Sequence, residues 1–168
     1  MIRSCDPADF AAIFEIINDA AEAYRGVIPA DRWHEPYMPE DQLAAEIEAG
    51  VAFHGLCEGA GGRLIGVMGI QPVKDVSLIR HAYVRTSNRQ AGVGAALLAH
   101  LQETNERPLL VGTWKAAAWA IRFYEKHGFE AVTEAETVEL LRRYWDIPAR
   151  QVETSVVLAD RRWLSANR

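Results

Sequence analysis

The sequence is poor in cysteine and contains no long hydrophobic run. Its 168 residues include two cysteines, Cys5 and Cys57, which lie far apart and form no Cys-x-x-Cys pair. A disulfide framework is therefore excluded, and we expect a reduced, cytoplasmic setting. No apolar stretch approaches the roughly 20 residues that span a bilayer, and no apolar signal core follows Met1. We expect neither membrane insertion nor secretion by a standard signal.

Several catalytic and binding motifs are also missing. The chain has no His-Glu-x-x-His, and His54, His100 and His127 show no metal-ligand spacing, so we predict no metal site. It has no Gly-x-Ser-x-Gly, which argues against a serine hydrolase, and no Gly-Lys pair, which excludes a P-loop. The formal net charge of −5 argues against broad nucleic-acid binding, because that requires clustered Lys and Arg. A local basic loop for a small phosphorylated ligand is still compatible with this charge.

Length and residue patterns indicate one α/β domain that spans residues 1–168. A chain of 168 residues with 49% hydrophobic and 24% charged residues is typical of a single globular domain. Apolar spacing predicts helices over about 6–24, 39–50, 92–106, 116–127 and 136–144, and it places Trp119 in the core. Strands are predicted at 2–4, 51–58, 64–71, 76–84, 108–113, 129–133 and 153–158. This order predicts a mixed sheet covered by helices.

The most informative segment runs from Arg89 to Gly94, between a predicted strand and a predicted helix. The start of a helix has unpaired N–H groups and a partial positive charge, so it binds anions. Gly92 and Gly94 lack a β-carbon and let a phosphate approach the backbone, and Arg89 adds a guanidinium that matches phosphate oxygens. The dinucleotide fingerprint would need a third glycine where Leu97 stands. The segment is therefore either a phosphate-binding loop or an ordinary tight turn.

With its surroundings, the segment resembles the acetyl-CoA signature of the GNAT superfamily of N-acetyltransferases. Its Arg-x-x-Gly-x-Gly pattern follows the strand residues Ala82–Val84, and Phe123–Phe129 is similar to that family's Phe-Tyr-x-x-x-Gly-Phe stretch. The resemblance covers nearly the whole chain, and Tyr24–Tyr37 is similar to members close to the phosphinothricin-acetyltransferase type. It implies one GNAT domain with a central, splayed, mostly antiparallel sheet flanked by helices.

The resemblance also implies acetyl-CoA as the acyl-donor co-substrate, without a metal. The pantetheine arm would pair with the strand before the loop, and the pyrophosphate would lie on the loop and the first helical turn. The implied cofactor-binding residues are Ala82, Tyr83, Val84, Arg89, Gln90, Ala91, Gly92, Val93, Gly94 and Ala95. One departure is Ala117, which stands where the family often has an asparagine that touches the cofactor. That side-chain contact is lost here, so either this helix contributes less to cofactor binding or Trp114 or Lys115 substitutes for it.

Two residues are candidates for catalysis. Tyr124 resembles the family's tyrosine that protonates the departing thiolate, although helical spacing alone would place it in the core. His81, on the strand before the loop, is the candidate general base because imidazole titrates near neutrality, and a structural histidine is the alternative. Strand alternation divides its neighbours between two faces, with Ile79, His81 and Tyr83 on one and Arg80, Ala82 and Val84 on the other.

The aromatic segment before Pro39 is the candidate substrate side. Trp33, Glu35 and Tyr37 are the candidate substrate-binding residues, because the rings offer a π face and Glu35, with Asp31, would attract a cationic amine. A loop held against the core by its aromatic rings is the alternative.

We therefore predict an enzyme that moves an acetyl group from acetyl-CoA to a primary amine of a small molecule. Direct attack in a ternary complex is expected, because Cys57 has no paired base that would activate it as a nucleophile. Two alternatives stay open. One is an acyl-CoA-binding sensor or assembly module without turnover, and the other is an acetyltransferase for protein or peptide amines. A homodimer is compatible with the family, and the sequence does not identify the amine.

Overall fold

Seven strands and seven α-helices make up the computed structural model, which describes residues 1–168. The strands are β1 (Ile2–Ser4), β2 (Ala52–Cys57), β3 (Leu64–Val73), β4 (Val76–Val84), β5 (Leu109–Trp114), β6 (Glu130–Ala131) and β7 (Ser155–Ala159). The helices are α1 (Phe10–Ala21), α2 (Glu40–Glu48), α3 (Val93–Thr104), α4 (Ala118–Lys126), α5 (Glu134–Tyr144), α6 (Ala149–Glu153) and α7 (Arg161–Asn167). Single 3₁₀ turns lie at Pro7–Asp9, Glu22–Tyr24, Ala30–Arg32 and Thr86–Asn88.

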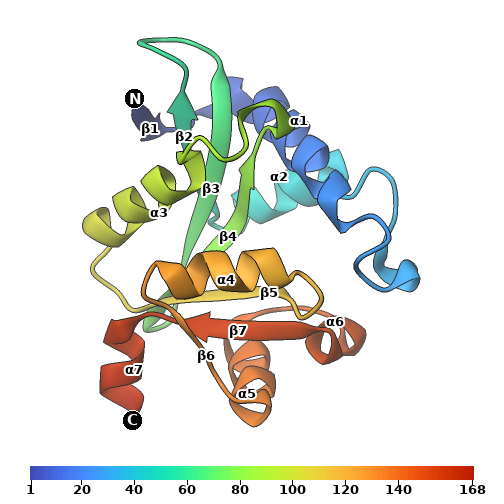
Figure 1. Ribbon diagram of the computed structural model, residues 1–168, viewed down its shortest axis with the longest axis vertical. Helices are drawn as coiled ribbons and strands as arrows, with labels where there is room; N and C mark the ends of the chain where they lie inside the picture. Colours follow the sequence, from blue (N-terminus) through green and yellow to red (C-terminus); the bar gives the residue numbers. More distant parts are fainter.

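The sheet opens between β4 and β5, which are its only parallel neighbours. Its strand order is β1-β2-β3-β4-β5-β7-β6, and every other neighbouring pair is antiparallel. β4 pairs with β5 only over Ser77–Ile79 and Leu109–Val111, and beyond these residues the strands separate. Figure 1 shows the consequence: β1–β4 lie in the upper half of the molecule and β5–β7 in the lower half. The predicted α/β fold with a splayed, mostly antiparallel sheet is confirmed.

Three large buried clusters and a small one around Ile28, Trp114 and Ala117 form the core. On one face of the sheet, Leu97 and Leu101 of α3 pack with Met68 of β3 and Val111 of β5, so this cluster joins the two halves. On the other face, α1 and α2 bury apolar side chains against β2 and β3. Helix α5 buries its apolar side chains against β4, β5 and β7. The opening in the sheet thus lies between two separately packed halves that share the α3 cluster.

The turn that precedes α3 is anchored to α1 by two charged groups. Asp19 accepts hydrogen bonds from the Thr86 N–H at 2.7 Å and from the Thr86 hydroxyl at 3.0 Å. Buried Arg85 donates to the Leu64 carbonyl at 2.8 Å and to Glu15 at 2.7 Å. These bonds fix where the chain leaves β4 and therefore where α3 begins.

Most predicted elements lie within a few residues of the observed ones, and the differences are near the C-terminus. The strand predicted at 129–133 is reduced to Glu130–Ala131, and the strand predicted to begin at Glu153 begins at Ser155. The later start of β7 follows from α6, an unpredicted helix that begins after Pro148, where a proline suits a helix start. The sequence patterns also do not predict α7, which Asp160 caps by accepting from the Trp163 N–H at 3.0 Å.

Two further features bear on function. None of the helices combines the length and the apolar character that crossing a membrane requires. No three His, Cys, Asp or Glu side chains come together in a group that could hold a metal ion.

Candidate functional site

A groove of about 870 Å³, here called the α3 groove, lies between the end of β4 and the helices α3 and α4. All of the predicted cofactor-binding residues line it except Ala91, which is exposed on the loop. Tyr124 and Trp119 of α4 line the opposite wall. The structure therefore gathers residues from two separate sequence motifs around one elongated space.

The N-terminus of α3 faces this groove without a cap. Gly92 precedes the helix with a φ of +77°, a left-handed conformation that glycine adopts without strain. No side chain caps the helix, and its first backbone bond runs from the Ala96 N–H to the Gly92 carbonyl. The N–H groups of Val93, Gly94 and Ala95 therefore have no helical acceptor. Together with the helix dipole they form a site suited to an anion.

Arg89 adds a positive charge to this end of the groove. Its guanidinium donates to the Ala20 carbonyl at 3.4 Å and forms no ion pair with a carboxylate. The charge is therefore not neutralised by the protein itself. A β-carbon at Gly94 would lie against the Phe123 ring at 3.4 Å, so this position faces the opposite wall of the groove closely.

Tyr124 lies on the buried side of α4 and reaches the α3 groove. Its ring packs edge-on against Phe123 and Phe129, and its hydroxyl makes no hydrogen bond within the protein. Burial raises the pKa of Tyr124, so the hydroxyl stays protonated at neutral pH and remains a donor. The prediction that Trp119 lies in the core is wrong: it is 41% exposed, because it lies on the groove side of α4 and stacks on Tyr24 at 5.9 Å.

A β-bulge in β4 corrects the predicted alternation of that strand. Tyr83 pairs with Val67 and Arg80 with Gly69, so His81 and Ala82 together face the single residue Met68. His81 takes the bulge conformation, with a φ of +54°. Ile79 therefore joins Ala82 and Val84 in the α3 cluster, whereas Arg80 lies with His81 and Tyr83 on the other side.

Glu46 of α2 holds the imidazole of His81. Its carboxylate is hydrogen-bonded to His81 Nε2, and the ring lies between Phe53 and Tyr83, at 6.1 Å and 6.4 Å. Burial raises the pKa of Glu46, but the His81 hydrogen bond and the charges of His81 and Arg80 outweigh burial and lower the pKa to about 2. An ionised carboxylate can only accept, so Nε2 carries the proton and the lone pair of the neutral ring is on Nδ1.

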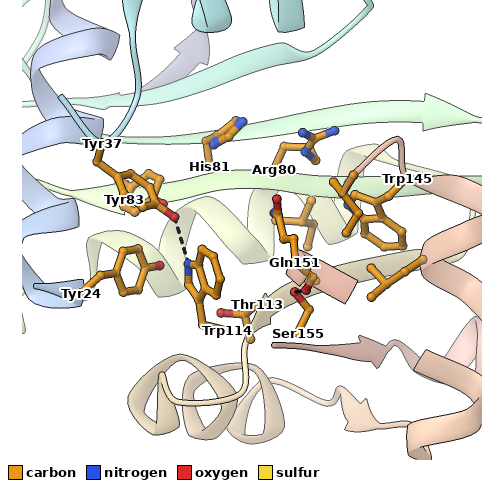
Figure 2. A pocket seen from close by; sticks show the side chains of 14 residues that line it. Tyr24, Tyr37, Arg80, His81, Tyr83, Thr113, Trp114, Trp145, Gln151 and Ser155 are labelled. Carbon is orange, nitrogen blue, oxygen red and sulfur yellow. Dashed lines mark hydrogen bonds between the residues drawn. The ribbon is translucent and has the colours of Figure 1, made fainter. Parts of the chain in front are cut away.

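On the other side of the splayed strands lies a smaller space of about 120 Å³, here called the aromatic cavity. Four segments far apart in sequence supply its wall: the chain around Tyr24 and Tyr37, the bulge of β4, the end of β5, and α5–α6 with the residues that follow. Its residues are Tyr24, Tyr37, Ile79, Arg80, His81, Tyr83, Gly112, Thr113, Trp114, Leu141, Trp145, Ile147, Gln151 and Ser155. Figure 2 shows Gln151 reaching from α6 toward β4, where Arg80 lies.

The segment 24–37 is tied to the C-terminal half of the molecule. Trp114 Nε1 donates to the Tyr37 hydroxyl at 2.9 Å, drawn as a dashed line in Figure 2. Asp31 accepts from Arg150 of α6 at 3.0 Å. This segment therefore bridges the opening of the sheet and closes one side of the aromatic cavity.

Tyr24 and Tyr83 are the only residues that line both spaces. Burial raises the pKa of both hydroxyls. The contact between them raises the pKa of Tyr83 further and lowers that of Tyr24 by less than burial raises it, so both stay protonated at neutral pH. The α3 groove and the aromatic cavity therefore meet at a pair of neutral phenols.

The predicted substrate residues are only partly brought together. Tyr37 lines the aromatic cavity, and Trp33 packs behind it with ring centroids 5.8 Å apart. The prediction that Glu35 and Asp31 line a pocket for a cation is wrong: neither lines the cavity, and both are exposed in ion pairs. Glu35 shares Arg25 with Glu22, and its carboxylate is directed to that guanidinium rather than to the cavity.

Ala117 does not line the α3 groove. It is fully buried with Ile28 and Trp114, beneath Trp33 and Tyr37. The site of the family's asparagine is therefore used here to pack the aromatic segment.

Sequence patterns missed several residues of these two spaces. Glu46 lies 35 positions before its partner His81. Regular alternation assigns Arg80 to the wrong face of β4, and Gln151 lies on the unpredicted helix α6. No local pattern could have found them, since each acts through a contact made only in the folded chain.

A comparison with family models identifies one matching domain. Residues 49–131, from the end of α2 to β6, match the model described as the acetyltransferase (GNAT) domain. The matched range contains β4, the phosphate-binding loop candidate, α3 and α4. No curated protein matches the chain by sequence.

Solved structures with the same fold are numerous but distant in sequence. A GNAT-family acetyltransferase from Staphylococcus aureus has a TM-score of 0.70 at 15% identity, covering 95% of this chain and 97% of that one. The Paia N-acetyltransferase of Thermoplasma acidophilum, solved with coenzyme A, has a TM-score of 0.68 at 16% identity with the same coverage. A ribosomal-protein-alanine N-acetyltransferase from Brucella melitensis has 0.61 at 20% identity, also over 95% of this chain and 97% of that chain. At these identities the likeness establishes the fold.

Proposed function

The chain belongs to the GNAT family of acetyl-CoA-dependent N-acetyltransferases, and we propose that it acetylates the primary amine of a small molecule by direct attack in a ternary complex. The observation that carries this proposal is the meeting of the two spaces at Tyr24 and Tyr83. It allows a donor in the α3 groove and an acceptor in the aromatic cavity to react directly. No covalent enzyme intermediate is needed.

The residues of the α3 groove fit acetyl-CoA as the acyl donor. The uncapped N–H groups of Val93, Gly94 and Ala95, with unpaired Arg89, suit its pyrophosphate. Beyond Ile79, β4 has no strand partner toward β5, so its backbone is open to the pantetheine arm near Ala82 and Val84. When bound, acetyl-CoA supplies the acetyl group as a thioester.

His81 is the proposed general base. Glu46 fixes the proton on Nε2, so Nδ1 can take the proton that the ammonium group of the acceptor must lose. The neutral nitrogen then forms a bond to the acetyl carbon while the carbon–sulfur bond breaks, and the nitrogen loses its second proton to solvent, which balances the proton that the sulfur gains. His81 later returns the proton to water, so the net products are the acetamide and free coenzyme A.

Tyr124 is the proposed proton donor to the leaving sulfur. Its hydroxyl lines the groove, is protonated at neutral pH, and has no partner in the protein that would compete for its hydrogen. Donation to a developing thiolate lowers the barrier for departure. Tyr124 then recovers a proton from solvent.

The aromatic cavity favours a small acceptor over a protein. Its volume of about 120 Å³ is close to that of a cavity that holds a benzene molecule, which is about 150 Å³. The bonds from Trp114 to Tyr37 and from Arg150 to Asp31 hold segment 24–37 over it. A peptide chain of several residues would need this segment to move.

Calorimetric titration with acetyl-CoA, followed by a thiol-release assay with panels of amines and short peptides, tests the proposal. Saturable binding should raise the melting temperature, since a hundredfold excess of ligand over Kd adds about 2.7 kcal/mol to the free energy of unfolding. An Arg89→Ala variant and a Gly94→Glu variant should bind acetyl-CoA more weakly. Arg122→Ala, on α4 but not lining either space, is the control and should bind normally.

Three outcomes separate the alternatives. Thiol release with small amines supports the proposal, and release with peptides alone replaces it with a peptide acetyltransferase. Binding of acetyl-CoA without turnover on any amine would favour a sensor. Absence of binding to acetyl-CoA and to longer acyl-CoAs would remove the α3 groove as a donor site.

A further inference from the structure

The aromatic cavity contains no carboxylate in its wall. Its charged or chargeable lining groups are Arg80 and His81, and the rest are aromatic, aliphatic, amide or hydroxyl side chains. The nearest acidic partner is Glu46, whose single charge is shared between Arg80 Nη2 at 3.3 Å and His81. A cationic acceptor would find no counter-ion within the cavity.

Arg32 adds an unneutralised charge at the edge of the same cavity. It is half-buried and forms no ion pair, and its one side-chain contact is from Nη2 to Gln151 Oε1 at 3.5 Å. Its Nε is buried without any hydrogen-bond partner, the only such side-chain atom in the protein. An unsatisfied buried donor is costly and calls for a partner that the protein itself does not supply.

Arg32 acts on the cavity through two of its lining residues. Gln151 is its hydrogen-bond partner, and Tyr37 is close enough for its pKa to respond: burial raises that pKa, and the Arg32 charge opposes the rise. With His81 neutral, Arg32 and Arg80 carry two positive charges against the one negative charge of Glu46. Asp31, the sequence neighbour of Arg32, is paired with Arg150, so the guanidinium of Arg32 keeps hydrogen-bonding capacity for a ligand.

We propose that the acceptor is an amine that also carries a carboxylate, such as a free amino acid, and that Arg32 binds this carboxylate beside Gln151. This inference rests on the proposed function, because it names the acceptor of that reaction. A guanidinium with free N–H groups pairs well with a carboxylate. Arg80 adds to the attraction from β4, and the small volume limits the acceptor to a compact molecule.

Matched acceptors test the proposal on the unaltered protein. Each amino acid is compared in the thiol-release assay with its decarboxylated amine and its carboxamide, and binding of each is followed by thermal shift in the presence of coenzyme A. We expect kcat/KM for the preferred amino acid to exceed that of its decarboxylated amine by about 100-fold or more, because the amine leaves Arg32 unpaired. Equal or better use of the decarboxylated amines overturns the proposal while leaving the acetyltransferase assignment intact.

Variants of Arg32 provide the second test. Arg32→Gln should raise KM for the amino acid on the order of 10–100-fold, because it removes a charge-assisted hydrogen bond to the carboxylate. The KM values for the decarboxylated amine and for acetyl-CoA should change little. Arg32→Lys should restore part of the loss. Arg150→Gln is the matched control, since it removes the Asp31 bond that ties the same segment to α6 but keeps Arg32.

The outcomes distinguish a binding role from a structural one. If Arg32→Gln and Arg150→Gln weaken all acceptors alike, Arg32 only supports the segment and the proposal is wrong. If titration finds no acetyl-CoA binding at all, the proposed function fails first and this inference fails with it.

Discussion

Trp114 and Tyr37 lie 77 positions apart in sequence, and the Trp114 indole N–H donates a 2.9 Å hydrogen bond to the Tyr37 hydroxyl. Trp114 ends β5 in the C-terminal half, and Tyr37 belongs to the segment that follows α1 in the N-terminal half. The bond therefore crosses the opening of the sheet where β4 and β5 no longer pair. It is one of the few polar ties across that opening.

Replacing Tyr37 by Phe should destabilise the protein by about 1–3 kcal/mol. The change leaves the Trp114 N–H without its acceptor, and Trp114 is only 8% exposed. Urea unfolding measures the loss, with Tyr124→Phe as the control because the Tyr124 hydroxyl has no protein partner. Equal stability of the two variants would mean that water replaces the Tyr37 hydroxyl at no cost. The acceptor KM of Tyr37→Phe should also rise.

Tyr124→Phe should lower kcat by roughly 100-fold while leaving the Kd for acetyl-CoA unchanged. The substitution removes only the proton donor, and the ring keeps its contacts with Phe123 and Phe129. Steady-state kinetics and calorimetry on the same preparation separate the two effects. An unchanged kcat would show that water protonates the sulfur.

Glu46→Gln should lower kcat by about 10-fold to 100-fold with little change in the KM for acetyl-CoA. An amide can no longer hold the Nε2 proton of His81 as an anion does, so Nδ1 is less often the free base. Glu46→Asp, which keeps the charge on a shorter side chain, should lie between wild type and Glu46→Gln. If His81→Asn retains wild-type kcat, the base is elsewhere and this prediction has no foundation.

Ionised Glu46 should also make the fold sensitive to acid. Its pKa is lowered from 4.5 to about 2, so its contribution to stability is present above pH 4.5 and is lost as the pH falls toward 2. Over that range the wild-type protein should lose roughly 1–3 kcal/mol more unfolding free energy than Glu46→Gln does. Parallel pH dependence of the two proteins in urea titrations would contradict the lowered pKa.

An Ala117→Asn substitution, which restores the asparagine that the family often has, should lower the stability of the folded protein. Ala117 is fully buried against Ile28 and Trp114, so an amide there would be buried without a partner and would cost about 1–3 kcal/mol. The Kd for acetyl-CoA should not improve, because this position does not line the α3 groove. Tighter binding at unchanged stability, seen by calorimetry and urea unfolding, would show that the introduced amide reaches the groove after all.

The α3 groove could be predicted from sequence because its key parts are local. A turn between a strand and a helix is encoded by neighbouring residues, and Gly92 to Ala95 are consecutive. The second wall came from one further motif around Tyr124. Two short stretches were therefore enough to predict which residues gather there.

The aromatic cavity could not be predicted in the same way. It is built from four segments, and its electrostatics depend on which carboxylates are already paired. Glu35 illustrates this point: the sequence places a carboxylate near aromatic rings, and only the fold reveals that it pairs with Arg25 outside the cavity. Alternation failed for Arg80 because it assumes regular pairing, and the bulge at His81 adds one residue to β4 opposite β3.

The two spaces share almost no lining residues, and this affects how such a protein can evolve. Only Tyr24 and Tyr83 belong to both, so most residues of the aromatic cavity can be exchanged without changing those of the α3 groove. Substitutions in segment 24–37 and in α6 would alter mainly the wall of the aromatic cavity. Under the proposed function, a lineage or a laboratory selection can therefore change the amine that is accepted while the residues of the α3 groove are inherited intact.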